Sequence, residues 1–162
     1  MARKAIKEVR GLSIFLQGIS LILPDSVVLQ ILPSADVSPV DNAPAWLLGT
    51  INWHKLTVPA LSFEAASDHQ YNPMEDPRMM VLKSINNIEK MPFYAIPLSG
   101  IPKPARMNGE NITVVENAGP SSPLILNEVL LDGEPVSIPN LDALEEMLIS
   151  QHDLFAEEVP AA

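Results

Sequence analysis

The sequence contains no cysteine among its 162 residues. This absence excludes disulfide bonds, thiol nucleophiles and thiolate metal ligands, and it is compatible with a reducing compartment. Aromatic residues make up only 5% of the chain, whereas hydrophobic residues reach 47%. The core must therefore be built mainly from aliphatic side chains, within one ordinary domain or two small subdomains that share that core.

Positive charge and long apolar runs are scarce as well. The formal net charge is −10 and the sequence pI is about 4.6. Binding of nucleic acid through its phosphates needs a basic surface, so we expect no nucleic-acid partner. No apolar run approaches the roughly 20 residues that span a bilayer, and no apolar secretory segment follows the basic start MARKAIKEVRG. We therefore expect no direct membrane insertion and a cytoplasmic location.

Motifs of catalysis and ligand binding are missing too. The chain has no G-x-S-x-G or S-x-x-K motif, no P-loop and no dinucleotide-binding glycine fingerprint. Its three histidines do not have metal-ligand spacing: His54, His69 and His152. The adjacent Glu145 and Glu146 point in different directions on a helix, so they are interpreted as solvated surface rather than an acid–base pair. The sequence thus predicts no catalytic residue, no metal and no cofactor.

Sixteen prolines are spread along the chain between short runs of Val, Ile and Leu. Proline breaks helices but is tolerated at strand ends and sheet edges, so this spacing predicts many short strands, as in small barrels. Asn108-Gly109 and Asp132-Gly133 are hairpin-turn dipeptides. A polar loop over residues 67–77 divides the chain. The predicted strands are Leu12–Leu16, Ser20–Leu23, Val27–Leu32, Gly49–Trp53, Thr57–Leu61, Arg78–Ile85, Phe93–Leu98, Ile112–Val115, Leu124–Val129 and Pro135–Ile138.

One convincing helix is predicted, at the C-terminal end. Asn140 is a good N-cap, and apolar residues then follow at helical spacing, beginning with Leu141, Leu144 and Leu148. We expect the helix to cover residues 140–155. A short helical turn is also expected around Pro44–Leu48.

The stretch APAWLLGTINWHKLTVPALSFE (residues 43–64) carries the most structured pattern. Two apolar segments flank a polar connection from Asn52 to Lys55. Polar tips between strands of a rigid scaffold are favoured docking sites, but a solvated turn without a role fits the pattern equally well.

This stretch resembles the central motif of CheW-like domains, the coupling modules of bacterial chemosensory arrays. Pro44, Gly49, Asn52 and Pro59 keep the spacing of that motif. Upstream, ISLILPDSVVLQILP resembles the family's preceding strand pair, and downstream LLDGEPVSIPNLDALEEML resembles its closing hairpin and helix.

The resemblance implies an all-β fold of two small five-stranded SH3-like barrels, packed on a shared aliphatic core with a C-terminal helix. It places a single CheW-like domain over residues 11–149, with approximate subdomains 11–75 and 76–139. It also implies a non-enzymatic adaptor that binds the regulatory domain of a CheA-type histidine kinase and the cytoplasmic tip of a chemoreceptor. Divergent members of this kind accompany the Chp-type systems that control type IV pili and twitching.

The same resemblance assigns the site. Partner-binding residues are expected at the polar tip and on the strand beside it: Val27, Val28, Gln30, Asn52, His54 and Lys55. Pro44, Gly49 and Pro59 are expected to shape the motif. The chain departs from the family at the tip, because His54 stands where the family has arginine and Lys55 where it has glycine. Histidine offers no permanently charged fork, and lysine adds bulk at a turn.

Two other functions stay open at this point. A small β-barrel enzyme would pair His54 with an acid, either Glu64 or Asp68. A self-associating structural domain would pair through an edge strand.

Overall fold

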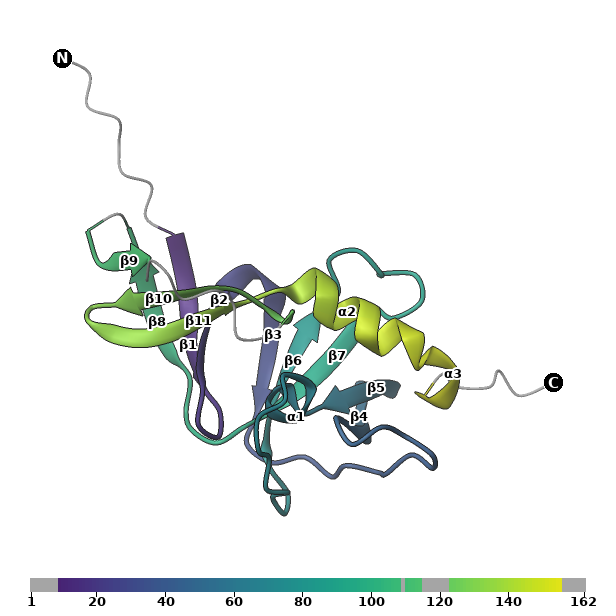
Figure 1. The fold of residues 1–162 in the computed structure, drawn as a ribbon. Coiled ribbons are helices and arrows are strands. Elements are labelled where there is room, and N and C mark those ends of the chain that lie inside the picture. The colour runs from purple at the N-terminus through teal and green to yellow at the C-terminus, as the bar shows by residue number, and fades with distance from the viewer. Residues whose placement is uncertain (1–8, 109, 115–122, 156–162) are drawn as a thin grey trace.

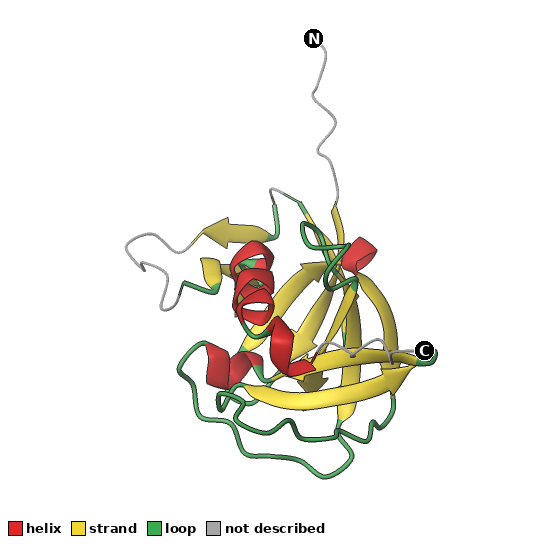
Figure 2. Cartoon of the chain, turned by 90° about the vertical axis from the view of Figure 1, so that its right-hand side faces the viewer, coloured by secondary structure: helices red, strands yellow, loops and turns green. Residues whose placement is uncertain are grey.

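The computed structural model describes residues 9–108, 110–114 and 123–155. These residues form two β-sheets that lie side by side, with the helices packed against one side of the curved strands (Figures 1 and 2). The first sheet has the order β8-β1-β2-β11-β10-β9 and the second β3-β6-β7-β5-β4. Neighbouring strands are antiparallel except for the pairs β2–β11 and β5–β7.

The strands of the first sheet come from both ends of the chain. They are β1 (Val9–Phe15), β2 (Ser20–Pro24), β8 (Lys103–Met107), β9 (Ile112–Val114), β10 (Ile125–Leu131) and β11 (Glu134–Pro139). The second sheet comes from the middle: β3 (Val28–Leu32), β4 (Leu47–Trp53), β5 (Leu56–Leu61), β6 (Arg78–Lys83) and β7 (Phe93–Leu98). This division differs from the predicted subdomains 11–75 and 76–139, because β1 pairs with β8 and β2 with β11, both of which lie in the second predicted subdomain.

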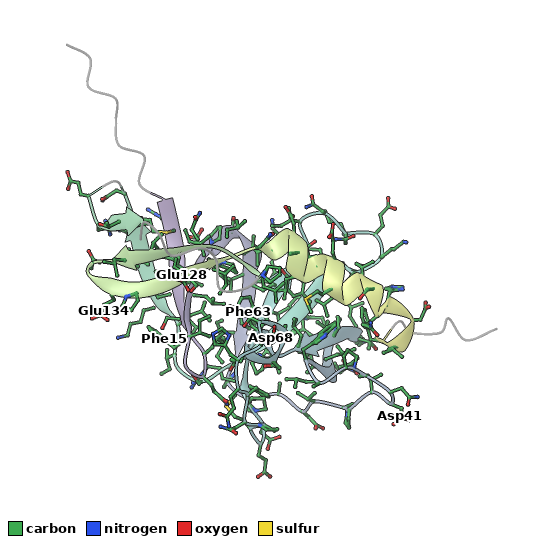
Figure 3. All side chains as sticks on the ribbon, in the orientation of Figure 1. Phe15, Asp41, Phe63, Asp68, Glu128 and Glu134 are labelled. Atoms are coloured by element: carbon green, nitrogen blue, oxygen red, sulfur yellow. The ribbon has the colours of Figure 1, made fainter. Side chains whose placement is uncertain are left out.

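Each sheet encloses a small apolar cluster, and a larger cluster joins the two. Val129 and Val136 belong to the cluster of the first sheet, and Ile51 and Val81 to that of the second. The shared core contains residues of both sheets and of the C-terminal helix, with Phe63 fully buried near the middle of the molecule (Figure 3). The prediction of two SH3-like barrels on a shared aliphatic core is thereby confirmed, with one strand more than expected in the first sheet.

The long C-terminal helix begins where a side chain caps it. Helix α2 (Leu141–Ser150) starts after Asn140, whose side chain accepts a hydrogen bond from the Ala143 amide at 3.1 Å, as expected for an N-cap. The chain turns at Gln151, so the predicted helical segment 140–155 contains α2 and a separate α3 (His152–Phe155).

Three short elements differ from the prediction. Helix α1 (Phe63–Ala66), capped by Ser62, was not expected. Strand β8 was missed because it contains Pro104, which is tolerated there since β8 lies at the edge of its sheet. The helical turn expected around Pro44–Leu48 is wrong: the chain makes a turn, and β4 already begins at Leu47.

The Asp132-Gly133 hairpin is confirmed, with Leu131 paired to Glu134 across the turn. The predicted Asn108-Gly109 turn includes Gly109, and the predicted strand Ile112–Val115 includes Val115; both residues lie outside the described ones. No helix within the described ranges is long and apolar enough to cross a membrane.

Candidate docking site at the β4–β5 hairpin

The polar tip predicted from the sequence is a two-residue hairpin between β4 and β5. Trp53 pairs with Leu56, which leaves only His54 and Lys55 in the turn. Both residues have positive φ, 49° for His54 and 64° for Lys55. This is the backbone signature of a type I′ turn, which favours Asn and Gly because they tolerate left-handed backbone. The side chains of Asn52, His54 and Lys55 are all exposed.

Trp53 supports the turn from one side. Its ring contacts His54 edge-on, with centroids 4.4 Å apart, and Phe93 of β7 in the same manner at 5.0 Å. Its indole Nε1 donates a hydrogen bond to Oε1 of Gln30 on β3 at 2.9 Å. The orientation of the tip is therefore tied to two other strands.

The Trp53–Gln30 bond joins the two edge strands of the second sheet. Strands β3 and β4 stand at opposite ends of its strand order, so the sheet has to curl for them to meet. A hollow of about 490 Å³ lies between them, and its walls include Gln30, Asn52 and His54. The structure thus brings three of the predicted partner-binding residues around one hollow.

The other two predicted residues on the β3 side do not face this hollow. Val27 ends a 3₁₀ turn (Asp25–Val27) and is only 6% exposed, packed in the shared core. Its prediction as a surface contact is therefore corrected: the turn directs its side chain inward. Val28 is half-buried against the same core. Leu29, by contrast, is 43% exposed at the edge of the sheet.

Gly49 shapes the strand that leads to the tip. Its φ is +146°, and a Cβ built there would lie 2.0 Å from the carbonyl oxygen of Ser38. Ser38 sits this close because it bridges to Thr50 through two backbone hydrogen bonds of 2.8 and 2.9 Å. The backbone conformation and the nearby Ser38 carbonyl therefore exclude every side chain at this position. The sequence had indicated only that the surroundings are apolar.

The two prolines of the motif play different parts. Pro59 is buried within β5, opposite Thr50 of β4. Pro44 accepts a hydrogen bond from the Leu47 amide at 3.0 Å, which closes the turn before β4. Both prolines thus fix the entry and the course of this hairpin.

The acids proposed as catalytic partners of His54 are engaged elsewhere or lie outside this hollow. Glu64 is fully buried, and its carboxylate accepts hydrogen bonds from the Gln17 amide at 3.1 Å and from the Ser62 hydroxyl at 3.3 Å. Burial raises the pKa of this carboxyl above its ordinary value. Asp68 does not line the hollow either. His54 stands on an exposed turn, and no acid among the described residues is hydrogen-bonded to it. Both observations count against the enzyme hypothesis.

Sequence reasoning missed two apolar contributors to this surface. Leu56 follows the turn directly and is 43% exposed, as is Leu29. If the turn had been assigned to His54 and Lys55 alone, Leu56 would have been identified as the cross-strand neighbour of Trp53, because the length of the turn fixes the register of a hairpin.

A family model of the CheW-like domain matches residues 10–147. The chain belongs to the CheW-like domain family. A comparison with curated protein sequences finds no match.

Among solved structures, the chain is similar to the scaffolding protein TtCheW from Thermoanaerobacter tengcongensis. The two share 10% sequence identity and superpose with a TM-score of 0.69, over 83% of this chain and 90% of that one. At this identity the likeness concerns the fold.

Proposed function

We propose that this chain is a non-enzymatic adaptor in bacterial chemosensory signalling. It would couple chemoreceptors to a CheA-type histidine kinase in the cytoplasm, in a system that controls type IV pili and twitching motility. Membership of the CheW-like family supports the adaptor role. The observation that carries the assignment of the site is the exposed tip His54-Lys55, whose two positive-φ residues are held by Trp53 beside a hollow between β3 and β4.

The proposed interface combines an apolar and a polar part. Leu29 and Leu56 offer exposed apolar area, and burial of apolar area supplies most of the affinity in protein association. Asn52, His54 and Lys55 offer hydrogen bonds and charge, which set the register of a partner. Non-glycine residues in left-handed backbone are strained, and such strain concentrates at functional positions.

His54 alters what this tip recognises. Arginine would present a planar, permanently charged fork for a carboxylate, whereas a histidine ring offers two separate nitrogens and no such fork. We therefore expect the partner's contact at this position to be a neutral polar group or a backbone group rather than a buried carboxylate.

The test is a binding titration with the regulatory domain of the CheA-type kinase and, separately, with a receptor tip fragment. His54→Ala and Lys55→Glu should each weaken binding to one partner by about tenfold, which corresponds to about 1.4 kcal/mol. Their thermal melts should stay close to that of the unaltered chain. Lys103→Glu on β8 makes the same charge change on the other sheet and is the matched control.

Unchanged affinity of both tip variants for every partner that binds the parent chain would remove the tip from the interface. Failure of the parent chain to bind any kinase domain or receptor fragment would remove the coupling role itself. Twitching of a strain that lacks the gene tests the wider pathway, and normal twitching would argue against it.

A further inference from the structure

A second hollow, here called the α3 groove, lies on the side of the β4–β5 hairpin that faces α3. Its volume is about 270 Å³, and its walls come from β5, from the loop between β6 and β7, and from α3. The apolar part includes Leu56, Pro59, Phe93 and Phe155. None of its lining residues also lines the hollow between β3 and β4. The α3 groove is therefore a separate hollow, and the exposed Leu56 lies at the border between it and the proposed tip site.

The topology explains why a groove opens here. Strands β5 and β7 are parallel neighbours, but their register contains the single pair Ala60 and Ala95. The pair stands near the end of β5, and Pro59 before it has no amide hydrogen to donate. The first half of β5 and the start of β7 are thus left apart, and α3 covers part of this gap.

The loop wall of the groove is fixed by the C-terminal helices. Glu145 of α2 is fully buried, which corrects its interpretation as solvated surface, and its carboxylate accepts hydrogen bonds from the amides of Ile85 and Asn86 at 2.9 and 3.0 Å. It also accepts one from the Asn87 side chain at 3.2 Å. At the far end of the loop, Nε2 of His152 donates to the Lys90 carbonyl oxygen at 3.0 Å, since a carbonyl can only accept. The groove is therefore held in shape without a ligand, which lowers the entropic cost of binding.

The charge of the groove is opposite to that of the chain. Lys90 is exposed and lines the groove together with His152, and no acidic residue lines it among the residues that the structure describes. The chain as a whole carries a formal charge of −10. The exposed apolar side chain of Leu56 also lines the groove, and it is 43% exposed. An apolar hollow with a lysine at its edge, on an acidic protein, is complementary to a segment that pairs an acidic side chain with an apolar one.

We propose that the α3 groove binds a segment of a partner protein in which an acidic side chain stands next to a large apolar one. The apolar side chain enters the hollow over Phe93 and Phe155, and the carboxylate meets the Lys90 ammonium. This proposal goes beyond the tip site: it gives the adaptor a second docking face on the other side of the same hairpin.

The test uses the full chain and three synthetic helical peptides of equal length. The first repeats Leu and Glu at helical spacing, the second has Lys in place of Glu, and the third has Ser in place of Leu. Fluorescence anisotropy should show saturable binding of the first peptide only, weakening as salt is raised. Lys90→Glu should reduce this binding at least tenfold and create binding of the lysine peptide. Lys103→Glu should change neither.

A second variant tests the fixed loop. Glu145→Gln keeps the size of the side chain but removes one acceptor oxygen, so it should weaken peptide binding while Lys90 stays in place. His54→Ala should leave peptide binding unchanged. If His54→Ala loses kinase or receptor binding but still binds the peptide, the lost interaction belongs to the tip alone. If Lys90→Glu loses peptide binding but still binds the kinase or receptor, the lost interaction belongs to the groove alone.

Several outcomes would overturn the proposal. Equal binding of the leucine–glutamate peptide by the parent chain and Lys90→Glu would exclude the groove as its site, as would no binding at all. Peptide binding that appears only after removal of residues 156–162 would show that the chain's own acidic end occupies the groove. A dimer in light scattering that Lys90→Glu dissociates without peptide would assign the groove to a second copy.

Discussion

Two hairpins of this molecule have the same turn geometry and very different turn residues. The β10–β11 hairpin turns at Asp132 and Gly133, with φ of 50° and 83°. The β4–β5 hairpin turns at His54 and Lys55, with φ of 49° and 64°. The first pair is among the sequences that such turns prefer, whereas the second is not. Glu134, the residue after the first turn, lies near the outer end of its hairpin in Figure 3.

The two hairpins depend on their turn residues to different degrees. At Asp132-Gly133 the residues match the backbone, so local chemistry is enough to form the turn. At His54-Lys55 the backbone is imposed by the strands on either side and by the Trp53 contacts. Left-handed backbone costs a non-glycine residue about 1–2 kcal/mol, and Asn-Gly would avoid this cost. We infer that the tip keeps His54 and Lys55 because their side chains serve the docking surface.

The largest predicted effect is the loss of stability when a side chain is added at Gly49. Gly49→Ala should destabilise the chain by more than about 4 kcal/mol, an exceptional value for one methyl group. The reason is twofold: φ is +146°, and the new Cβ would lie 2.0 Å from the Ser38 carbonyl oxygen. Gly133→Ala should cost only about 1 kcal/mol, because its φ is +83° but nothing lies within 4 Å of the added Cβ.

Urea denaturation of both variants, monitored by circular dichroism, gives their free energies of unfolding. The difference between them separates the cost of the collision with Ser38 from the cost of the backbone strain that both variants share. Similar losses in the two variants would show that Ser38 moves aside easily. The close approach of the Ser38 bridge to β4 would then be of little consequence for the stability of the second sheet.

Exchanging the turn residues tests the comparison itself. His54-Lys55→Asn-Gly should stabilise the chain by about 1–2 kcal/mol, and Asp132-Gly133→His-Lys should destabilise it by a similar amount. The first exchange should also weaken partner binding at the tip, whereas the second should leave it unchanged. Denaturation midpoints and the kinase-domain titration give both readouts.

A stable Asn-Gly variant with full affinity would contradict the inference that the tip side chains contact a partner. A destabilised one would show that Trp53 and its neighbours contribute more to the turn through His54 than the backbone strain costs. Either result would show that the unusual residues of the β4–β5 turn are not explained by partner binding alone.

The hairpins also show what could be predicted from the sequence. Asp132-Gly133 and the Asn140 cap were predicted because one or two residues determine each of these structures. The sequence pattern located the polar tip but did not reveal its turn type, because His54 and Lys55 are not residues that favour left-handed backbone. The family resemblance supplied the barrel pair, which composition alone did not define.

The missed features depend on residues far apart in the chain. The pairing of β1 with β8 follows from the closure of a barrel, so the predicted boundary near residue 75 had no local signal against it. Val27 was placed on the surface because its strand was extended through a 3₁₀ turn. The Trp53–Gln30 bond depends on the curl of the second sheet, and the α3 groove depends on the position of α3. The spacing of apolar residues in the sequence reveals neither.

The smallest predicted effect concerns the contact that holds the tip. Gln30→Ala removes the acceptor of the Trp53 indole hydrogen bond. Because Gln30 is exposed, water can replace the lost partner, and the stability should fall by only about 0.5 kcal/mol. Hydrogen exchange at the Trp53 indole and at the Lys55 amide should nevertheless accelerate, since the tip loses its link to β3.

Gln70→Ala, in an exposed loop, is the matched control and should leave both signals unchanged. The Asp132-Gly133 turn should also keep its exchange rate in Gln30→Ala, because its own residues favour its backbone. If the two turns accelerate together, the change is a general loosening of the molecule. If neither does, the strands alone impose the geometry of the tip, and Trp53 positions His54 without stabilising the turn.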